Sequence, residues 1–266
     1  MTEPASGWDC HVHVFDAAAP VRTGHYRPQD RPLSQIEAVA AMAGVGHLVL
    51  VQPSVYGTDN TLMLQALAQG AGRHRGVVVL DDAGDRAALD ALHAVGVRGV
   101  RLNRVSPVGA GDDVATHYAR LAPHLHERGW HLEWYAAAEQ LPQIAALHAD
   151  DGPVCVLDHL AGLRAGVEHA PAVWAALRAL ADRGAWVKLS GWYRLGASEP
   201  YAALWPTIGR VAAIFGERMV WGSDWPHTQF AAPPWPDYAS TWTPVVHAIG
   251  AAAATAIRCR QPTLYR

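Results

Sequence analysis

Two short segments near opposite ends of the chain carry residues that could do chemistry together. His11 and His13 stand two residues apart in the run DCHVH, and Asp224 lies in the run GSDWPH. Side chains alternate between the two faces of a strand, so residues two apart share a face. We therefore expect both imidazoles to face one small target and a second strand, ending at Asp224, to add a carboxylate. Such a set could hold a metal ion or activate a water molecule.

The elements that must position these residues repeat along the chain. Runs rich in Val, Leu, Trp and Tyr predict eight strands at about residues 7–15, 45–54, 75–80, 97–103, 131–137, 153–160, 185–191 and 218–225. Apolar residues every three or four positions predict helices between them, among them 33–43, 58–70, 86–95, 170–183 and 201–215. This alternation predicts an α/β protein, a (β/α)8 TIM barrel formed as a single domain by residues 1–266.

Barrel geometry predicts where the function lies, because active sites of this fold occupy the carboxyl ends of the strands. His159 follows the sixth predicted strand, Arg101 lies near the end of the fourth, and other polar residues follow neighbouring strands. Each residue alone has a structural explanation: an HxH pair is often accidental among 15 histidines, and Asp224 could cap a helix. The convergence of His11, His13, His159 and Asp224 favours the functional interpretation.

Composition narrows the class of protein. The net charge is −3 and 17% of residues are charged, so no basic face predicts nucleic-acid binding. No run of eighteen apolar residues and no apolar leader occurs, which predicts a soluble, cytoplasmic protein that does not engage a membrane. The three cysteines lack the spacing of a disulfide framework or a zinc finger. A small molecule is the expected partner, and the sequence leaves open whether the protein is a monomer or a homodimer.

Several motifs together resemble a known family. The runs DCHVH, QPSVYGTDN, VRGVRLN, LDHLAG, VKLSGWYRL and WGSDWPH are similar to the amidohydrolase superfamily, in particular its branch of 2-pyrone-4,6-dicarboxylate lactonases and related sugar or muconolactone hydrolases. The resemblance runs from residue 9 to the end. It implies a distorted barrel, hydrolysis of a cyclic ester, and catalytic use of His11, His13, His159 and Asp224. The single lysine, Lys188, falls in the seventh strand rather than the fourth or fifth, which disfavours a two-metal site.

Opening a lactone requires an activated water and a polarised carbonyl group. We expect Asp224 to be the general base, while His11, His13 and His159 hold either the carbonyl oxygen or, with Asp224, one divalent ion, for which zinc is the best match. A metal-free mechanism remains open. Arg101 would bind a substrate carboxylate or the developing oxyanion. Further substrate contacts are predicted for Ser54, Tyr56, Arg104, Tyr135, Arg194 and His227.

The expected function is hydrolysis of a small anionic lactone: a pyrone dicarboxylate, a muconolactone or a sugar lactone. Two alternatives remain at this point. A metal-dependent decarboxylase of the same superfamily would use a similar residue set and release carbon dioxide, and a non-catalytic barrel would only bind its ligand. The loop at 57–60 and the pair Arg101 and Arg194 favour the lactonase.

Overall fold

The computed structural model describes residues 6–23, 26–106, 113–228, 230, 235–260 and 262–266. In this part of the chain eight parallel strands follow one another around a single sheet in sequence order, which confirms the predicted (β/α)8 barrel. The strands are β1 (Gly7–Val12), β2 (Val45–Val51), β3 (Arg75–Val78), β4 (Val97–Asn103), β5 (His131–Tyr135), β6 (Cys155–Leu157), β7 (Trp186–Leu189) and β8 (Met219–Trp221).

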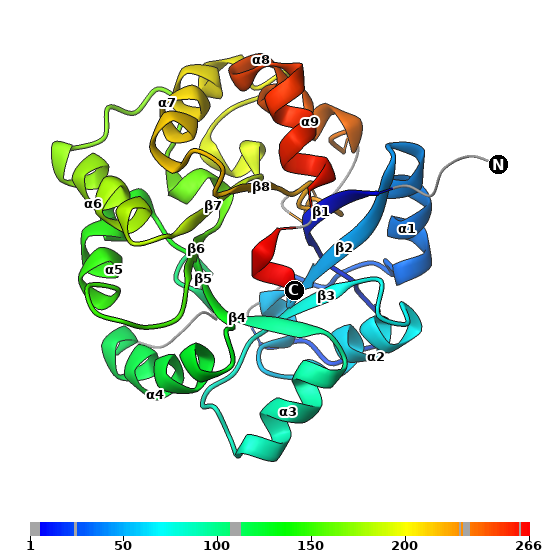
Figure 1. Ribbon diagram of the computed structural model, residues 1–266. Helices are drawn as coiled ribbons and strands as arrows, with labels where there is room; N and C mark the ends of the chain where they lie inside the picture. Colours follow the sequence, from blue (N-terminus) through cyan, green and yellow to red (C-terminus); the bar gives the residue numbers. More distant parts are fainter. Residues whose placement is uncertain (1–5, 24–25, 107–112, 229, 231–234, 261) are drawn as a thin grey trace.

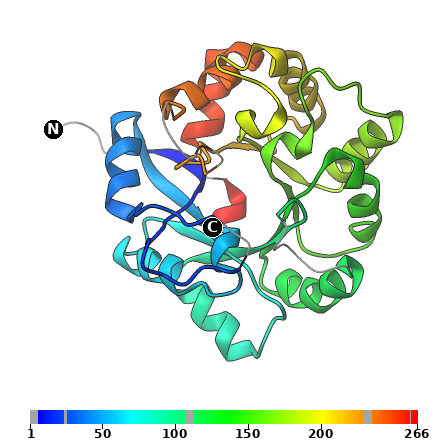
Figure 2. The ribbon, with the colours of Figure 1, turned by 180° about the vertical axis from the view of Figure 1, so that it is seen from behind.

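The helices form an outer ring around these strands, as Figures 1 and 2 show from opposite sides. They are α1 (Leu33–Met42), α2 (Thr61–Gln69), α3 (Arg86–Ala94), α4 (Val114–Glu127), α5 (Leu141–Leu147), α6 (Pro171–Asp182), α7 (Trp205–Phe215), α8 (Thr243–Ile249) and α9 (Ala251–Cys259). Short 3-10 turns supplement them, including η1 (Ser54–Tyr56) and η3 (His159–Gly162) after β2 and β6. None of the helices among the described residues is long and apolar enough to cross a membrane.

The barrel closes where the first strand meets the last. The amide of Asp224 donates to the carbonyl of His11 at 2.9 Å, and the amide of His13 donates to the carbonyl of Trp225 at 2.9 Å. Closure leaves neither β1 nor β8 as an open edge. It also fixes the DCHVH run against the GSDWPH run, so residues more than 200 positions apart become neighbours.

Several strands end earlier than the sequence predicts. β8 ends at Trp221 rather than at 225, and β6 ends at Leu157 rather than at 160. The reason is backbone geometry: His159 and Asp224 have φ angles of 47° and 60°, which lie outside the strand region. The chain therefore leaves the extended conformation just where it presents these side chains.

A bulge in β1 sets which side chains enter the barrel. Asp9 pairs with Leu48 and Val12 pairs with Leu50, so two residues of β1 lie opposite one residue of β2. Before the bulge, Trp8 and Cys10 belong to the interior apolar cluster. After it, Val12 packs in the outer cluster between strands and helices, so His11 and His13 face inward.

The final residues of the described chain close the end of the barrel at which the strands begin. Tyr265 is fully buried, and its ring stacks 6.1 Å from that of Trp8. Arg75 and Arg98, near the starts of β3 and β4, donate to the carbonyls of Tyr265 and Arg266 at 2.8 and 2.7 Å. This segment, red in Figure 1, lies across the centre of the barrel. Above it, five valines from β2, β3, β6 and β8, together with Cys10, fill the lower interior.

A buried histidine makes the stability of this fold depend on pH. Trp134 donates its indole N–H to Nε2 of His148 at 2.9 Å, so Nε2 must stay unprotonated. Burial lowers the pKa of His148 from 6.5 to about 4. The unfolded chain then binds the extra proton more readily than the folded one, so this contribution to stability is present above pH 6.5 and is lost as the pH falls toward 4.

We expect the wild-type protein to lose up to about 3 kcal/mol of unfolding free energy over this range through His148, since each pKa unit corresponds to about 1.4 kcal/mol. His148→Gln keeps an acceptor but does not titrate, so its loss over the same range should be smaller. Urea unfolding at pH 7 and pH 4.5 measures the difference. Identical pH dependence in both proteins would contradict the prediction.

Candidate active site

The structure brings His11, His13, His159 and Asp224 together at the carboxyl ends of β1, β6 and β8. Nε2 of His11 and Nε2 of His13 lie 3.7 and 3.4 Å from Oδ1 of Asp224. The rings of His11 and His159 are 4.8 Å apart, centroid to centroid. All four side chains are buried. The carboxylate and three imidazoles therefore face one small volume at the base of the barrel mouth.

The two oxygens of Asp224 have different surroundings. Oδ2 accepts hydrogen bonds from the hydroxyl of Tyr193 at 2.6 Å and from Nε of Arg194 at 2.5 Å. Oδ1 is buried and has no hydrogen-bond partner within the described residues. Burial alone would raise the pKa of Asp224, but the charge of Arg194, with smaller contributions from the histidines, holds it well below its usual value. The carboxylate is thus ionised, with Oδ1 available as a proton acceptor.

The three histidines have distinct hydrogen bonds. Nδ1 of His13 lies 2.7 Å from the carbonyl of Val51, so it carries a proton and leaves Nε2 as an acceptor when the ring is neutral. Nδ1 of His159 lies 3.0 Å from Oγ of Ser190, and burial lowers the pKa of His159 to about 3. Burial and the charge of Lys188 also hold the pKa of His11 well below its usual value. His11 and His159 are therefore neutral in the folded protein.

A layer of buried charges lies directly beneath these residues and was not predicted from the sequence. Lys188 of β7 forms an ion pair with Glu133 of β5 and lies 3.4 Å from Oδ1 of Asp158. Arg101 of β4 donates from Nε to Oδ2 of Asp158 at 2.8 Å. Burial alone would raise the pKa of Asp158, but Lys188 and Arg101 hold it well below its usual value. Charged residues inside otherwise apolar strands, at 133 and 188, were the sequence signal for this layer.

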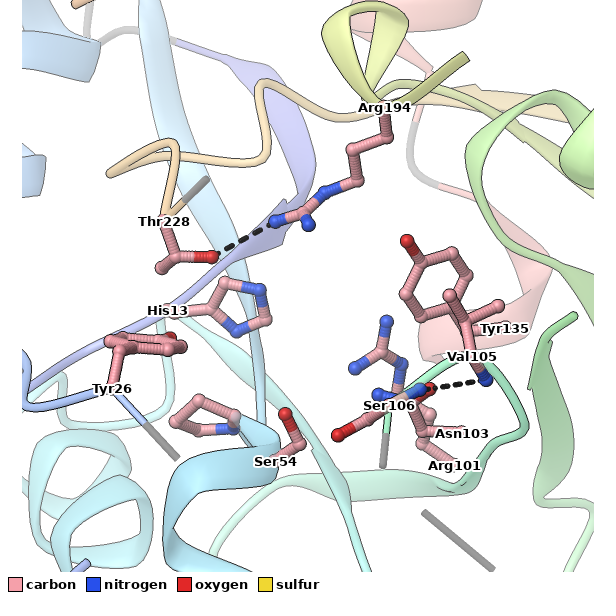
Figure 3. A pocket seen from close by; sticks show the side chains of 11 residues that line it. His13, Tyr26, Ser54, Arg101, Asn103, Val105, Ser106, Tyr135, Arg194 and Thr228 are labelled. Atoms are coloured by element: carbon pink, nitrogen blue, oxygen red, sulfur yellow. Dashed lines mark hydrogen bonds between the residues drawn. The ribbon is translucent and has the colours of Figure 1, made fainter. Parts of the chain in front are cut away.

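Above the layer is a cavity of about 240 Å³ lined by residues from several strand ends. Figure 3 shows Arg101 and Arg194 extending toward the cavity from different sides, with His13 near its base. Arg194 also donates to Oγ1 of Thr228 at 3.0 Å. The remaining lining residues are Tyr26, Pro53, Ser54, Asn103, Val105, Ser106, Tyr135 and Thr228. Two guanidinium groups among hydroxyls and amides suit a small anionic, oxygen-rich ligand.

The structure brings some predicted substrate contacts to this cavity and leaves others outside it. Ser54, Tyr135 and Arg194 line it. Tyr56 instead packs with Phe15 and Val55, and its hydroxyl donates to the carbonyl of Asp16 at 2.9 Å.

Two further predicted contacts are absent from the cavity lining, although both lie near residues that belong to it. The backbone amide of Arg104 donates to the carbonyl of Tyr135 at 2.7 Å. His227 is buried, and its ring lies 5.7 Å from that of Tyr193. Burial lowers the pKa of His227 to about 4.

The residues of the site also fit a divalent metal ion. His11, His159 and Asp224 each offer a ligand atom, and these atoms lie within 4.8 Å of one another. Within the described residues, Nε2 of His11 and Oδ1 of Asp224 are buried without hydrogen-bond partners. A second group, His11, Glu133 and Asp158, has similar spacing, but Lys188 and Arg101 already neutralise its two carboxylates. The donor set therefore suits one ion of the type that imidazole and carboxylate bind.

Fold and site together define a (β/α)8 barrel with imidazoles and a carboxylate at its mouth, the place where enzymes of this fold have their active sites. Residues 8–244 match the amidohydrolase family model, and the chain belongs to this family. A 4-sulfomuconolactone hydrolase from Rhizobium radiobacter is 30% identical over 237 residues, covering 86% of this chain and 79% of that protein. A 2-pyrone-4,6-dicarboxylate hydrolase from Comamonas testosteroni is 30% identical over 243 residues, covering 84% and 78%.

A solved structure extends the comparison to three dimensions. The crystal structure of a putative 2-pyrone-4,6-dicarboxylic acid hydrolase from Pseudomonas putida superimposes with a TM-score of 0.84 and 32% sequence identity. The match covers 96% of this chain and 94% of that one. The family resemblance expected from the sequence motifs is thereby confirmed.

Close packing between β8 and β1 predicts that the site tolerates no side chain at Gly222. A Cβ atom there would lie 2.5 Å from Cβ of His11 and 2.9 Å from its backbone nitrogen. We expect Gly222→Ala to lose about 1–3 kcal/mol of unfolding free energy, as overpacked sites do, and to displace His11 from Asp224. Gly209→Ala in α7 is the matched control, because its Cβ would meet only the carbonyl of Ala248 in α8, at 3.7 Å.

Alanine in a helix interior is favoured over glycine by about 0.5–1 kcal/mol, so Gly209→Ala should be neutral or stabilising. Urea unfolding measures both variants. Equal stability of Gly222→Ala and the parent would show that β1 and β8 can separate without cost.

Proposed function

We propose that the protein hydrolyses a small anionic lactone with Asp224 as the general base. The observation that carries this proposal is the pairing of Oδ1 of Asp224 with Nε2 of His13 across 3.4 Å. Both atoms are acceptors when His13 is neutral, so a water molecule that lies beside the pair can donate a proton to Oδ1 while it stays next to Nε2. Such a water has its lone pair free to attack a carbonyl carbon above it.

The reaction then follows from the positions of the groups. The water oxygen bonds to the carbonyl carbon as its proton passes to Oδ1 of Asp224. Charge develops on the former carbonyl oxygen, where an imidazole N–H of the site can stabilise it. Collapse of the tetrahedral intermediate breaks the ester C–O bond, and the ring oxygen that leaves takes the proton from Asp224. The product is the ring-opened acid.

The substrate class is supported by the cavity and by the relatives. Arg101 and Arg194 line a space of about 240 Å³, which suits a small molecule bearing negative charge. The named relatives act on a sulfomuconolactone and a pyrone dicarboxylate, both of which are anionic cyclic esters. A more distant relative is named D-galactarolactone isomerase. These names favour the lactonase over the decarboxylase and over a barrel that only binds.

A metal ion is compatible with this function but is not needed for the steps above. His11, His159 and Asp224 would hold it. When bound, one divalent ion such as zinc supplies polarisation of the carbonyl group and acidifies a bound water. With or without a metal ion, Asp224 would accept the proton and the two arginines would contact the substrate anion.

Replacing the base tests the function directly. We expect Asp224→Asn to lower kcat for lactone hydrolysis by roughly a thousandfold or more, since an amide cannot accept the proton in the transition state. Substrate should still bind, which isothermal titration would detect. Analysis of the products distinguishes a ring-opened acid from released carbon dioxide. Full turnover by Asp224→Asn would assign the base role to another residue.

The proposed contact between Arg101 and an anionic substrate is tested by a substitution that changes the shape of the side chain and keeps its charge. Arg101→Lys retains a cation but loses the planar fork, so kcat/KM should fall about 10- to 100-fold for an anionic lactone, the equivalent of a charged hydrogen bond. The fall should be smaller for a neutral lactone of the same ring size. Arg98→Lys makes the same change on the same strand at the other end of the barrel, and should leave both rates unchanged.

An equal fall for charged and neutral lactones would contradict the proposed contact. Arg101 would then act only through its ion pair with Asp158.

A further inference from the structure

We propose that Lys188 is a positioning residue that fixes the tautomer of His11, placing the ring proton on Nε2. His11 then faces the reacting carbonyl as a hydrogen-bond donor. The role of that donor rests on the proposed lactonase function, whereas the tautomer itself does not.

The contacts of Lys188 point to this assignment. Its Nζ forms an ion pair with Glu133, lies 3.4 Å from Oδ1 of Asp158, and lies 3.2 Å from Nδ1 of His11. An ammonium group has three N–H donors and no acceptor. Nδ1 of His11, which lies within hydrogen-bond distance of Nζ, must therefore be the acceptor of this pair. Nδ1 of His11 can accept only if it carries no proton, which leaves the proton on Nε2.

The opposite tautomer fits these positions less well. With a proton on Nδ1, His11 and Lys188 would direct two N–H groups at each other across 3.2 Å. Oδ1 of Asp158 lies 3.4 Å from both Nδ1 of His11 and Nζ of Lys188, and within the described residues it forms a hydrogen bond with neither. The charges of this layer already sum to zero, because Glu133 and Asp158 balance Lys188 and Arg101. A second proton on His11 would add an uncompensated buried charge.

The two histidines of the HxH pair then have opposite roles. His13 donates from Nδ1 to the carbonyl of Val51 and offers Nε2 as an acceptor. His11 accepts at Nδ1 and offers Nε2–H as a donor, 3.7 Å from Oδ1 of Asp224. One imidazole can thus hold the attacking water, and the other can stabilise the oxyanion that forms. A divalent ion held by Nε2 of His11 would need the lone pair there, so its binding would require the ring proton to leave Nε2.

The experiment reads the tautomer by NMR. Protein labelled with 15N-histidine, as purified, gives long-range proton–nitrogen correlations that distinguish a protonated from an unprotonated ring nitrogen, and the spectrum of His11→Asn assigns the His11 signals by their loss. We expect the wild-type protein to carry the His11 proton on Nε2. A proton on Nδ1, or a signal typical of a metal-bound Nε2, would overturn the proposal whether or not any variant folds.

The variant Lys188→Met tests whether Lys188 sets the tautomer of His11. Without the ammonium group, the His11 proton should move to Nδ1 and donate to Asp158, and zinc affinity measured by competition with a chelator should rise about 10-fold or more, as expected for a changed partner behind a metal-binding histidine. Lys188→Met/Glu133→Gln makes the same change at unchanged net charge and should show the same shift. Ser190→Ala, which removes the partner of His159, should leave the His11 tautomer unchanged.

An unaltered tautomer in a folded Lys188→Met protein would overturn the proposal. The kinetic result is separate: kcat should fall more than KM changes, since the donor acts on the transition state. If the wild-type protein shows the Nε2 proton but opens no lactone, the proposed function fails and the assignment to Lys188 stands.

Discussion

The structure depends on a layer of paired charges inside the barrel. Glu133, Asp158 and Lys188 are fully buried, and Arg101 is 4% exposed. Moving an ion out of water costs several kcal/mol, and loss of one partner leaves the other uncompensated. Three of these residues lie in β4, β5 and β7, and Asp158 directly follows β6, so their mutual neutralisation requires these four strands to stand side by side in the barrel. The layer separates the apolar lower interior from the mouth and supports His11 from below, which means that the site and the fold share one electrostatic requirement.

Above this layer, backbone geometry rather than charge positions the reacting groups. His159 and Asp224 both adopt left-handed φ angles, which cost non-glycine residues about 1 kcal/mol or more. The packing around them leaves little freedom: a Cβ at Gly191 would lie 2.4 Å from Nδ1 of His159, and one at Gly222 would lie 2.5 Å from Cβ of His11. Glycines thus allow the strands to approach until the imidazoles and Asp224 meet. The conformational cost is localised where the chemistry requires an exact orientation of side chains.

Much of this arrangement could be predicted from the sequence, and the remainder could not for physical reasons. Alternating strand and helix signals predicted the barrel. The HxH spacing and a distant aspartate predicted that His11, His13 and Asp224 would converge. The bulge in β1 could not be predicted from the sequence, because it depends on how β1 pairs with β2. Lys188 and Glu133 carried a local signal as charges in apolar strands, but their meeting depends on barrel closure. Tyr56 shows the converse: it follows a strand as the other contacts do, yet its hydroxyl turns to Asp16.

In the proposed mechanism, Arg194 would link the charge of the substrate to the strength of Asp224 as a base. It donates from Nε to Oδ2 of Asp224, and the same side chain lines the cavity. Before substrate binds, this cation keeps Asp224 ionised but also weakens it as a proton acceptor. An anion in the cavity competes for the guanidinium and adds negative charge nearby, and both effects raise the affinity of Asp224 for a proton. A neutral lactone of the same shape would bind without this change. In that mechanism the ion pair between Arg194 and Asp224 would give selectivity for anionic substrates in the proton-transfer step as well as in binding.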